Sequence, residues 1–240
     1  MNINKNTLIS TIVAENYKSA TIFKSYGIDF CCNGNRSIET VCNTKNINKS
    51  ILINKLDNCF KSEIDTNNYQ AWDIDFLSDY IYNKHHKYVE KTIPELKLYL
   101  DKLCKVHGMY HPELFEIYKL FTESANDLTM HMKKEELILF PYFKKLIKAA
   151  KNKSTISSNL FNSLKSPIAM MHEEHDNEGS RFRKISELSN NYSPPVDACN
   201  TYKVTYHLLQ EFEEDLHKHI HLENNILFKK GVELEKTLQN

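Results

Sequence analysis

Hydrophobic residues recur at intervals of three and four along most of this chain, which is the spacing of one face of an α-helix. From about Trp72 onward the pattern predicts four long amphipathic helices. Their expected ranges are roughly 74–104, 112–150, 166 to the Ser-Pro-Pro segment at 193–195, and 196–234. Pro94 falls inside the first helix, where proline can kink the chain, and Pro112 suits the first turn of the second. Four helices with short connections predict an up-down-up-down bundle.

The first sixty-odd residues predict a separate small helical unit. A rough helical stripe from Leu8 to Phe23 is followed by Gly27, a residue that commonly stops helices. Two shorter helices are expected over 37–42 and 50–60, and the polar run 63–68 resembles a linker. We therefore expect an all-α protein with a small domain over 1–63 and the bundle over 72–240. A unit this small is expected to lean on a partner.

Composition narrows the class of protein. Hydrophobic residues make up 41% and charged residues 26%, as in soluble globular proteins, and the 5 glycines are few for a sheet-rich fold. Thirty-one Lys and Arg balance thirty-one Asp and Glu, which argues against non-specific nucleic-acid binding. No apolar run approaches the ~18 residues of a membrane span, and the N-terminus does not resemble a signal peptide. A cytoplasmic protein with reduced cysteines is the expectation.

One internal repeat carries the chemistry. The pattern H-x-x-x-E-x-x-I-L-F occurs at 131–140 and again at 219–228, in the second and fourth predicted helices. Residues four apart lie on one helix face, so His131 with Glu135, and His219 with Glu223, each present an imidazole beside a carboxylate. In both copies the Ile-Leu pair, at 138–139 and 226–227, is expected to continue that face into the core. A core-facing glutamate is costly unless it is paired or bound to metal. Two such devices on alternate helices predict a pseudo-twofold site at the bundle centre.

The first and third helices should supply two more nitrogen ligands. On the third helix the choice lies between His172 and His175, and His175 is favoured because Ile168 and Met171 share its face.

On the first helix, His85 and His86 point about 100° apart, so at most one faces the core. His86 is favoured because Tyr82, Val89 and Ile93 describe a buried face with it.

The resulting set contains four imidazoles and two carboxylates: His86, His131, Glu135, His175, His219 and Glu223. Imidazole with bridging carboxylate and no thiolate suits iron or manganese, and zinc less well. The set differs from the ferritin-like di-iron pattern, which uses Glu-x-x-His and more carboxylates. Asp127, one turn before His131, and Glu174, beside His175, are candidate polar neighbours of the ligands or of an access route.

Cys31 and Cys32 are adjacent in a turn-rich segment with Asn33 and Gly34. They could be a chance pair in a small core, since free cysteine is commonly buried. Alternatively, adjacent thiols in such a turn are accessible to a metal or an oxidant. A disulfide between neighbours would be strained and is not expected to be a structural link.

These motifs together resemble the iron–sulfur cluster repair di-iron proteins. The resemblance covers essentially the whole chain, through the two H-x-x-x-E helices, the P-I-x-x-M-x-x-E-H-D run at 167–176 and the F-C-C-x-G segment at 30–34. It implies a small N-terminal domain with a Cys-Cys pair, followed by a hemerythrin-like four-helix bundle. The family's ligands map onto the same six positions, and its thiol pair onto Cys31 and Cys32. Many members carry Gly where this chain has Asn33, and Asn tolerates the positive φ of such a turn.

The resemblance implies a cytoplasmic, stress-linked protein that restores iron–sulfur clusters damaged by nitric oxide or oxidants. Iron would come from a labile centre of two non-haem iron ions with an oxo or hydroxo bridge, and Cys31 and Cys32 could relay iron or respond to redox state. Damaged iron–sulfur proteins would be the clients, and oxygen or nitric oxide the small ligands. Neither nucleic acid nor a membrane is an expected partner, and the N-terminal unit could mediate a homodimer.

Other functions remain open on the sequence. A hemerythrin-like carrier or sensor of oxygen or nitric oxide would use the same centre without needing the cysteine pair. A nitric oxide reductase would turn over repeatedly with a reductant. An iron store ranks last, because two metals in each chain are few for storage.

Overall fold

The fold is all-α, as predicted. The computed structural model describes residues 1–61, 68–155 and 163–239. Within these ranges every regular element is a helix, and strand-like pairing is limited to one isolated bridge between Leu8 and Ser37.

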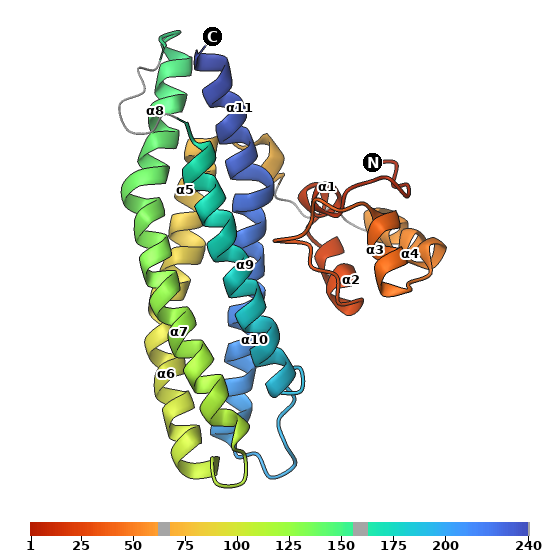
Figure 1. Ribbon diagram of the computed structural model, residues 1–240, viewed down its shortest axis with the longest axis vertical. Helices are drawn as coiled ribbons and strands as arrows, with labels where there is room; N and C mark the ends of the chain where they lie inside the picture. Colours follow the sequence, from red (N-terminus) through yellow and green to blue (C-terminus); the bar gives the residue numbers. More distant parts are fainter. Residues whose placement is uncertain (62–67, 156–162, 240) are drawn as a thin grey trace.

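Four long helical rods form the body of the molecule within the described residues. The first consists of α5 (Ile74–Ile81), η2 (Tyr82–His86) and α6 (Lys87–His107), after the short η1 (Tyr69–Ala71). The second consists of α7 (Glu113–Lys134), η3 (Glu135–Leu139) and α8 (Phe140–Lys151), and the third is α9 (Lys165–Leu188). The fourth consists of α10 (Asn200–Leu222), η4 (Glu223–Leu227) and α11 (Phe228–Gln239). Successive rods run in opposite directions, so the up-down bundle is confirmed (Figure 1).

The ends of the rods follow the capping chemistry of the sequence. Helix α6 continues through Pro94, and α7 begins directly after Pro112, which occupies its N-cap position. The fourth rod begins at Asn200, four residues later than Val196, because Cys199 has an extended backbone at the N-cap. Side-chain periodicity therefore predicts the rods better than it predicts their first residues.

Three of these rods contain a π turn at nearly corresponding positions in the described chain. They are η2, η3 and η4, each five residues long. A π turn inserts one residue into an α-helix and changes which side chains face the core, and such turns are frequent at functional sites. The expectation that Ile138 faces the core is wrong, because it is 44% exposed, whereas Ile226, at the same position of η4, is buried.

The N-terminal unit contains four short helices: α1 (Ile9–Glu15), α2 (Ser19–Ser25), α3 (Ile38–Lys45) and α4 (Lys49–Lys61). The single stripe expected from Leu8 to Phe23 is wrong, because the chain breaks at Asn16, whose backbone is extended and whose side chain accepts a hydrogen bond from the Lys18 amide. Gly27 follows α2 with a φ of 61°, which favours glycine. The predicted linker at 63–68 lies outside the described residues except for Asn68.

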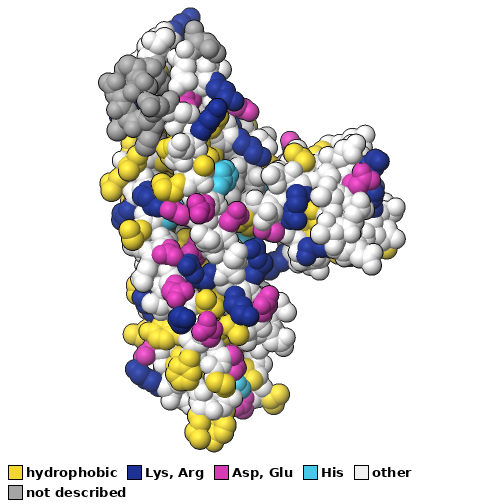
Figure 2. All heavy atoms as spheres, viewed as in Figure 1, with side chains coloured by type: hydrophobic (Ala, Val, Ile, Leu, Met, Phe, Trp, Pro, Cys, Tyr) yellow, Lys and Arg dark blue, Asp and Glu magenta, His cyan; other side chains and the backbone are white. Residues whose placement is uncertain are grey.

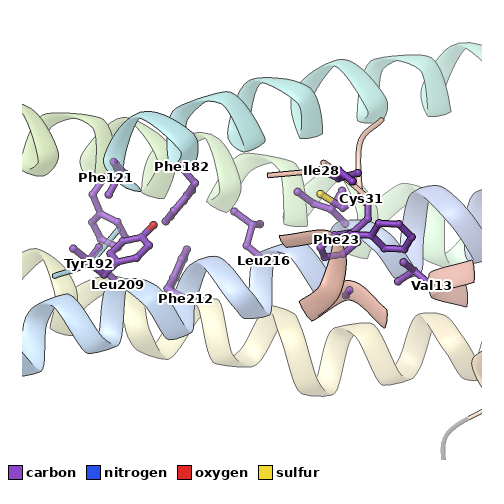
Figure 3. Close-up of a cluster of buried hydrophobic side chains, with 14 of the residues drawn as sticks. Val13, Phe23, Ile28, Cys31, Phe121, Phe182, Tyr192, Leu209, Phe212 and Leu216 are labelled. Carbon is purple, nitrogen blue, oxygen red and sulfur yellow. The ribbon is translucent and has the colours of Figure 1, made fainter. Parts of the chain in front are cut away.

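The N-terminal unit packs against the side of the bundle, next to the fourth rod (Figure 1). Helix α1 contacts both α10 and η4, and the Lys24 ammonium lies 3.0 Å from the Glu213 carboxylate. One hydrophobic cluster runs through both parts: Phe23 and Cys31 of the unit and Leu216 of α10 belong to it (Figure 3). The unit therefore shares a core with the bundle.

The surface carries charges of both signs, interspersed along the bundle face shown in Figure 2. Exposed apolar side chains gather at the end of the bundle near the α6–α7 turn, where Met109 and Tyr110 are 87% and 77% exposed. Among the described helices, none combines the length and the hydropathy needed to cross a membrane.

Two apolar layers enclose the middle of the bundle. Leu128 of α7 and Leu216 of α10 belong to one buried cluster, whereas Leu139 and Leu227 belong to another. The H-x-x-x-E segments lie between these residues in sequence on both rods. Their charged side chains are therefore held between two apolar layers.

Candidate metal centre

The four rods bring all six predicted side chains together in the middle of the bundle. They form two groups of four buried side chains. One group contains His86 and His219, the other contains His131 and His175, and both groups contain Glu135 and Glu223. Within a group, the ligand atoms all lie within 4.8 Å of one another. Because both glutamates belong to both groups, the arrangement can hold two cations bridged by two carboxylates.

The imidazoles present their Nε2 atoms to the centre. Nε2 of His86 lies 3.3 Å and Nε2 of His131 lies 3.4 Å from the same oxygen of Glu135. One oxygen of Glu223 lies 2.9 Å from Nε2 of His219, and its other oxygen lies 3.2 Å from Nε2 of His175. Each glutamate thus stands between imidazoles from two different rods.

Two observations on the donor set fit a bound cation. The Nε2 atoms of His131 and His175 lie 3.0 Å apart, although two nitrogens with lone pairs repel unless one carries a proton or both face a cation. Both oxygens of Glu135 are buried and have no hydrogen-bond partner among the described residues. An ionised, unsatisfied carboxylate costs several kcal/mol to bury, whereas a metal ion would satisfy it.

The two carboxylates remain ionised in this setting. Burial would raise the pKa of Glu223, but His219 and His175 hold it well below its usual range. Burial and Glu223 would likewise raise the pKa of Glu135, but His131 and His86 keep it below its usual value. The centre therefore presents two negative charges inside an apolar layer.

The imidazoles titrate in opposite directions. Burial alone would lower the pKa of His131, but Glu135 and Glu174 raise it to about 10. The pKa of His86 is also raised, against the effect of burial, by Glu135. Burial dominates at His219 and lowers its pKa. A cation must therefore displace a proton from the His131 side of the centre.

Comparison with known proteins agrees with this geometry. A family model described as "Hemerythrin HHE cation binding domain" matches residues 78–230, more than half of the chain, and a "Domain of Unknown function (DUF542)" matches residues 5–59. The chain is 34% identical to the iron-sulfur cluster repair protein ScdA of Staphylococcus epidermidis, over 95% of this chain and 99% of that protein. It is 29% identical to the iron-sulfur cluster repair protein YtfE of Musicola paradisiaca, over 90% of this chain and 91% of that protein.

The chain belongs to the iron–sulfur cluster repair family. The resemblance of its motifs to that family is confirmed, and its bundle is a hemerythrin-type cation-binding domain. A probable repair protein of Haemophilus influenzae is also similar, at 32% identity over 86% of this chain and 88% of that protein.

In this member of the repair family, three of the four ligand imidazoles have a polar partner at their outer nitrogen. Nδ1 of His131 lies 2.7 Å from the Glu174 carboxylate, which was a predicted polar neighbour. The contact with His131 lowers the pKa of Glu174 to about 2. Such partners orient the ring and fix which nitrogen faces the metal.

Two further partners were missed in the sequence. Nδ1 of His86 lies 3.0 Å from Glu136, and Nδ1 of His175 lies 2.8 Å from Asn224. The sequence did contain a signal for these two partners, because Glu136 and Asn224 each directly follow the glutamate of one H-x-x-x-E copy. In the π turn this next residue also turns inward, toward the histidine of a neighbouring rod.

The repeat itself is longer than its histidine and glutamate. It reads D-L-x-x-H-x-x-x-E-x-x-I-L-F in both copies, from Asp127 and from Asp215. The closing phenylalanines stack on neighbouring ligand rings: Phe140 on His86 with centroids 5.4 Å apart and Phe228 on His175 at 6.1 Å. Each copy therefore supplies two candidate ligands and fixes a third from the adjacent rod.

The pseudo-twofold symmetry breaks at the outer edge of the centre. Asp127 is 62% exposed and accepts a hydrogen bond from Arg181 rather than from a ligand histidine. It lines a pocket of about 270 Å³ together with His131 and His175, as a group on an access route would. Its counterpart Asp215 instead lies 2.9 Å from His85.

The symmetry breaks a second time on the first and third rods, which contribute one candidate ligand each. The residues before these two histidines differ in kind. Glu174 precedes His175 and meets His131, whereas His85 precedes His86 and stacks on His219 with centroids 5.5 Å apart. Nδ1 of His219 consequently has no hydrogen-bond partner within the described part of the chain.

The structure distinguishes the competing histidines. His85 is buried beside Asp215 and lies outside both groups of four, and His172 lines a pocket near Phe228. The expectation that at most one of His85 and His86 faces the core is wrong, because both are buried; only His86 belongs to a group of candidate ligands.

The thiol pair lies against the centre through the N-terminal unit. The Asn224 amide donates to the backbone carbonyl of Cys31 at 3.3 Å while its oxygen meets His175. The thiol of Cys32 points at the His175 carbonyl, 3.5 Å away. The hydrogen bond to Cys32 and burial hold the pKa of the Cys31 thiol well above its usual value.

Proposed function

We propose that this protein repairs iron–sulfur clusters damaged by nitric oxide or oxidants, by supplying iron from a labile non-haem di-iron centre. The observation that carries the proposal is the pair of four-donor groups that share Glu135 and Glu223 in a buried layer. The relatives named above, ScdA and YtfE, are both named iron-sulfur cluster repair proteins.

In this proposal Glu135 and Glu223 would both be shared by two iron ions, and His86, His131, His175 and His219 would complete the ligand set. Bound there with an oxo or hydroxo bridge, the iron pair would supply one-electron redox chemistry. The protein's own part is to hold two carboxylates ionised, to aim four imidazoles inward and to exclude water with apolar layers. Nitrogen-rich ligation leaves less negative charge on the metals than a ferritin-like set does, which favours release over storage.

Cys31 and Cys32 are proposed to accept or relay iron on its way to a client. Their position supports this role, because the Cys32 thiol lies at the backbone of His175. The clients are proteins with damaged clusters, met in the cytoplasm, and oxygen or nitric oxide are the small ligands of the centre.

Metal content of protein purified without oxygen tests the centre. We expect about two irons per chain in the unaltered protein and less than about a tenth of that after joint Glu135→Gln and Glu223→Gln substitution, because the bridging charges are gone. Glu235→Gln is the matched control, since Glu235 is also a buried glutamate but bonds the Leu164 amide. A single zinc, or iron retained in the double variant, contradicts the proposal.

Reactivation of a nitric-oxide-treated iron–sulfur enzyme tests the function. We expect the iron-loaded protein to restore its activity, and the Cys31→Ser, Cys32→Ser variant to bind iron but restore little. Full restoration by that variant removes the cysteines from the pathway. Gas binding without any restoration favours a hemerythrin-like sensor, and repeated turnover of nitric oxide with a reductant favours a reductase.

A further inference from the structure

The loop after α2 gathers three side chains that can bind metal and that belong to neither group of the bundle's six candidate ligands. The carboxylate of Asp29 and the sulfurs of Cys31 and Cys32 lie within 4.8 Å of one another. The Cys31 thiol points at one oxygen of Asp29, 3.4 Å away, and its sulfur lies 3.7 Å from that of Cys32.

Asp29 also shapes the loop that presents the thiols. Its Oδ1 atom accepts hydrogen bonds from the backbone amides of Cys31 at 3.2 Å, Cys32 at 3.0 Å and Asn33 at 3.4 Å. Its other oxygen, Oδ2, accepts a hydrogen bond from the side-chain amide of Asn33 at 2.8 Å. The same oxygen lies 3.3 Å from the Arg183 guanidinium. These bonds hold two adjacent side chains on the same side of the chain, which adjacent residues rarely achieve without such a turn.

The distance between the sulfurs matches shared coordination. Two thiolates bound to one tetrahedral ion at about 2.3 Å stand about 3.8 Å apart, close to the separation seen here. A disulfide would require about 2.05 Å and a strained eight-membered ring. Both cysteines are free. The loop is therefore preorganised for a cation rather than for oxidation to a disulfide.

The sulfurs are reachable from two sides. Asp29 and Cys31 line a pocket of about 260 Å³, and Cys32 lines another of about 500 Å³ together with His172. Gly179 of α9 allows the Cys32 sulfur to approach the helix closely, because a Cβ there would lie 3.3 Å from the sulfur, tighter than an ordinary contact. Glycine inside a helix costs about 1 kcal/mol relative to alanine, which marks the close approach as a specific feature.

We propose that Asp29, Cys31 and Cys32 form a cation site of their own, separate from the bundle centre, for a divalent transition metal of the Fe2+ and Zn2+ class. Two thiolates with one carboxylate suit such borderline ions. Three protein ligands leave a fourth position open, as in sites whose ion stays exchangeable. The existence of this site does not depend on the function proposed above. Its use as a binding site for iron that leaves the bundle centre does rest on that function.

Cobalt is the probe that reports this site directly, because Co2+ bound to thiolate absorbs in the near ultraviolet and Co2+ bound to imidazole and carboxylate does not. Metal-free full-length protein is titrated with Co2+ without oxygen. We expect a thiolate-to-cobalt band in the unaltered protein. The same band should remain in the Glu135→Gln, Glu223→Gln variant, whose bundle centre is disabled.

Three variants locate the ligands. Cys31→Ser with Cys32→Ser should abolish the band, and Cys199→Ser, which removes an exposed thiol, should leave it unchanged. Asp29→Asn keeps an oxygen for the three amide bonds but loses the charge, so we expect affinity to fall at least about tenfold. Far-ultraviolet circular dichroism checks that each variant is folded.

The outcomes separate the two proposals. Absence of the band in the unaltered protein, or its survival in the double serine variant, overturns the cation site and leaves the bundle centre standing. An unchanged affinity in a folded Asp29→Asn variant overturns the carboxylate ligand. Iron retained by the Glu135→Gln, Glu223→Gln variant overturns the bundle centre, whatever the cobalt band shows.

Discussion

Asn224 joins two parts of the molecule through one side chain. Its oxygen meets Nδ1 of His175 and its amide nitrogen holds the carbonyl of Cys31. An amide oxygen in that place accepts a hydrogen bond, so Nδ1 of His175 carries the proton and Nε2 is left free to bind metal.

We predict that Asn224→Ala weakens metal binding at the centre by about 10–100-fold, since the outer partner of a ligand histidine is lost. The control is Asn225→Ala, because Asn225 also donates to the Cys31 carbonyl, at 3.2 Å, but does not touch His175. Competition with a chromophoric chelator measures both affinities. Equal losses in the two variants would assign the effect to the thiol loop instead.

At this scale the sequence predicted the six side chains that the structure brings together and one of their three outer partners, Glu174, but missed Glu136 and Asn224. Helical periodicity states which positions share a face, and on that ground His86 was preferred to His85. It does not state which residue of another rod meets the outer nitrogen of a ring. Glu136 and Asn224 reach those nitrogens because π turns redirect them, and no local propensity for a π turn was visible.

At the scale of helices, the π turns divide three rods into segments with different faces. Upstream of η3 and η4 the rods present ligands, and downstream they present apolar residues to a second core layer. In that layer Gly231 of α11 packs directly on Phe143 of α8, where a Cβ would lie 2.5 Å from the ring.

We predict that Gly231→Ala destabilises the fold by up to about 2 kcal/mol, despite the better helix propensity of alanine. Overpacking of about 1–3 kcal/mol outweighs a propensity gain of about 1 kcal/mol, because the Phe143 ring is fully buried and cannot move aside. Urea unfolding gives the difference. In a Phe143→Leu background the cost should shrink or reverse, and an undiminished cost there would point to backbone strain instead.

The long helices were predictable because they are long and strongly periodic. Errors gathered where periodicity within one helix does not decide the outcome: Asn16 splits the first stripe into α1 and α2, and Ile138 is exposed. Ile226, at the same position of the other copy, is buried where α1 contacts η4. The pattern of one helix does not state what packs against its outer face.

At the scale of the whole molecule, the N-terminal unit covers one side of the bundle. Phe30 and Tyr17 pack on His221 of α10, which is 1% exposed. Burial without a compensating charge lowers the pKa of His221 to about 3, so the ring stays neutral under the unit.

We predict that a fragment of residues 68–240 folds as a bundle but unfolds at a lower urea concentration than the full chain. The shared apolar cluster becomes exposed on one side, at roughly 25 cal/mol for each Å² of apolar surface. Circular dichroism during urea titration measures the midpoints. Equal midpoints would show that the predicted domains, 1–63 and 72–240, are energetically independent.

Nδ1 of His219 has no hydrogen-bond partner among the described residues, which predicts different exchange rates for ions in the two halves of the proposed centre. In one half, Glu174 fixes the ring of His131 and Asn224 fixes the ring of His175. In the other half, Glu136 fixes the ring of His86, and no described residue bonds Nδ1 of His219. A ring without an outer partner rotates away from its ion more readily. The ion held by His86 and His219 should therefore leave first, which would make this a donor that gives up one ion quickly and keeps the other as a reserve.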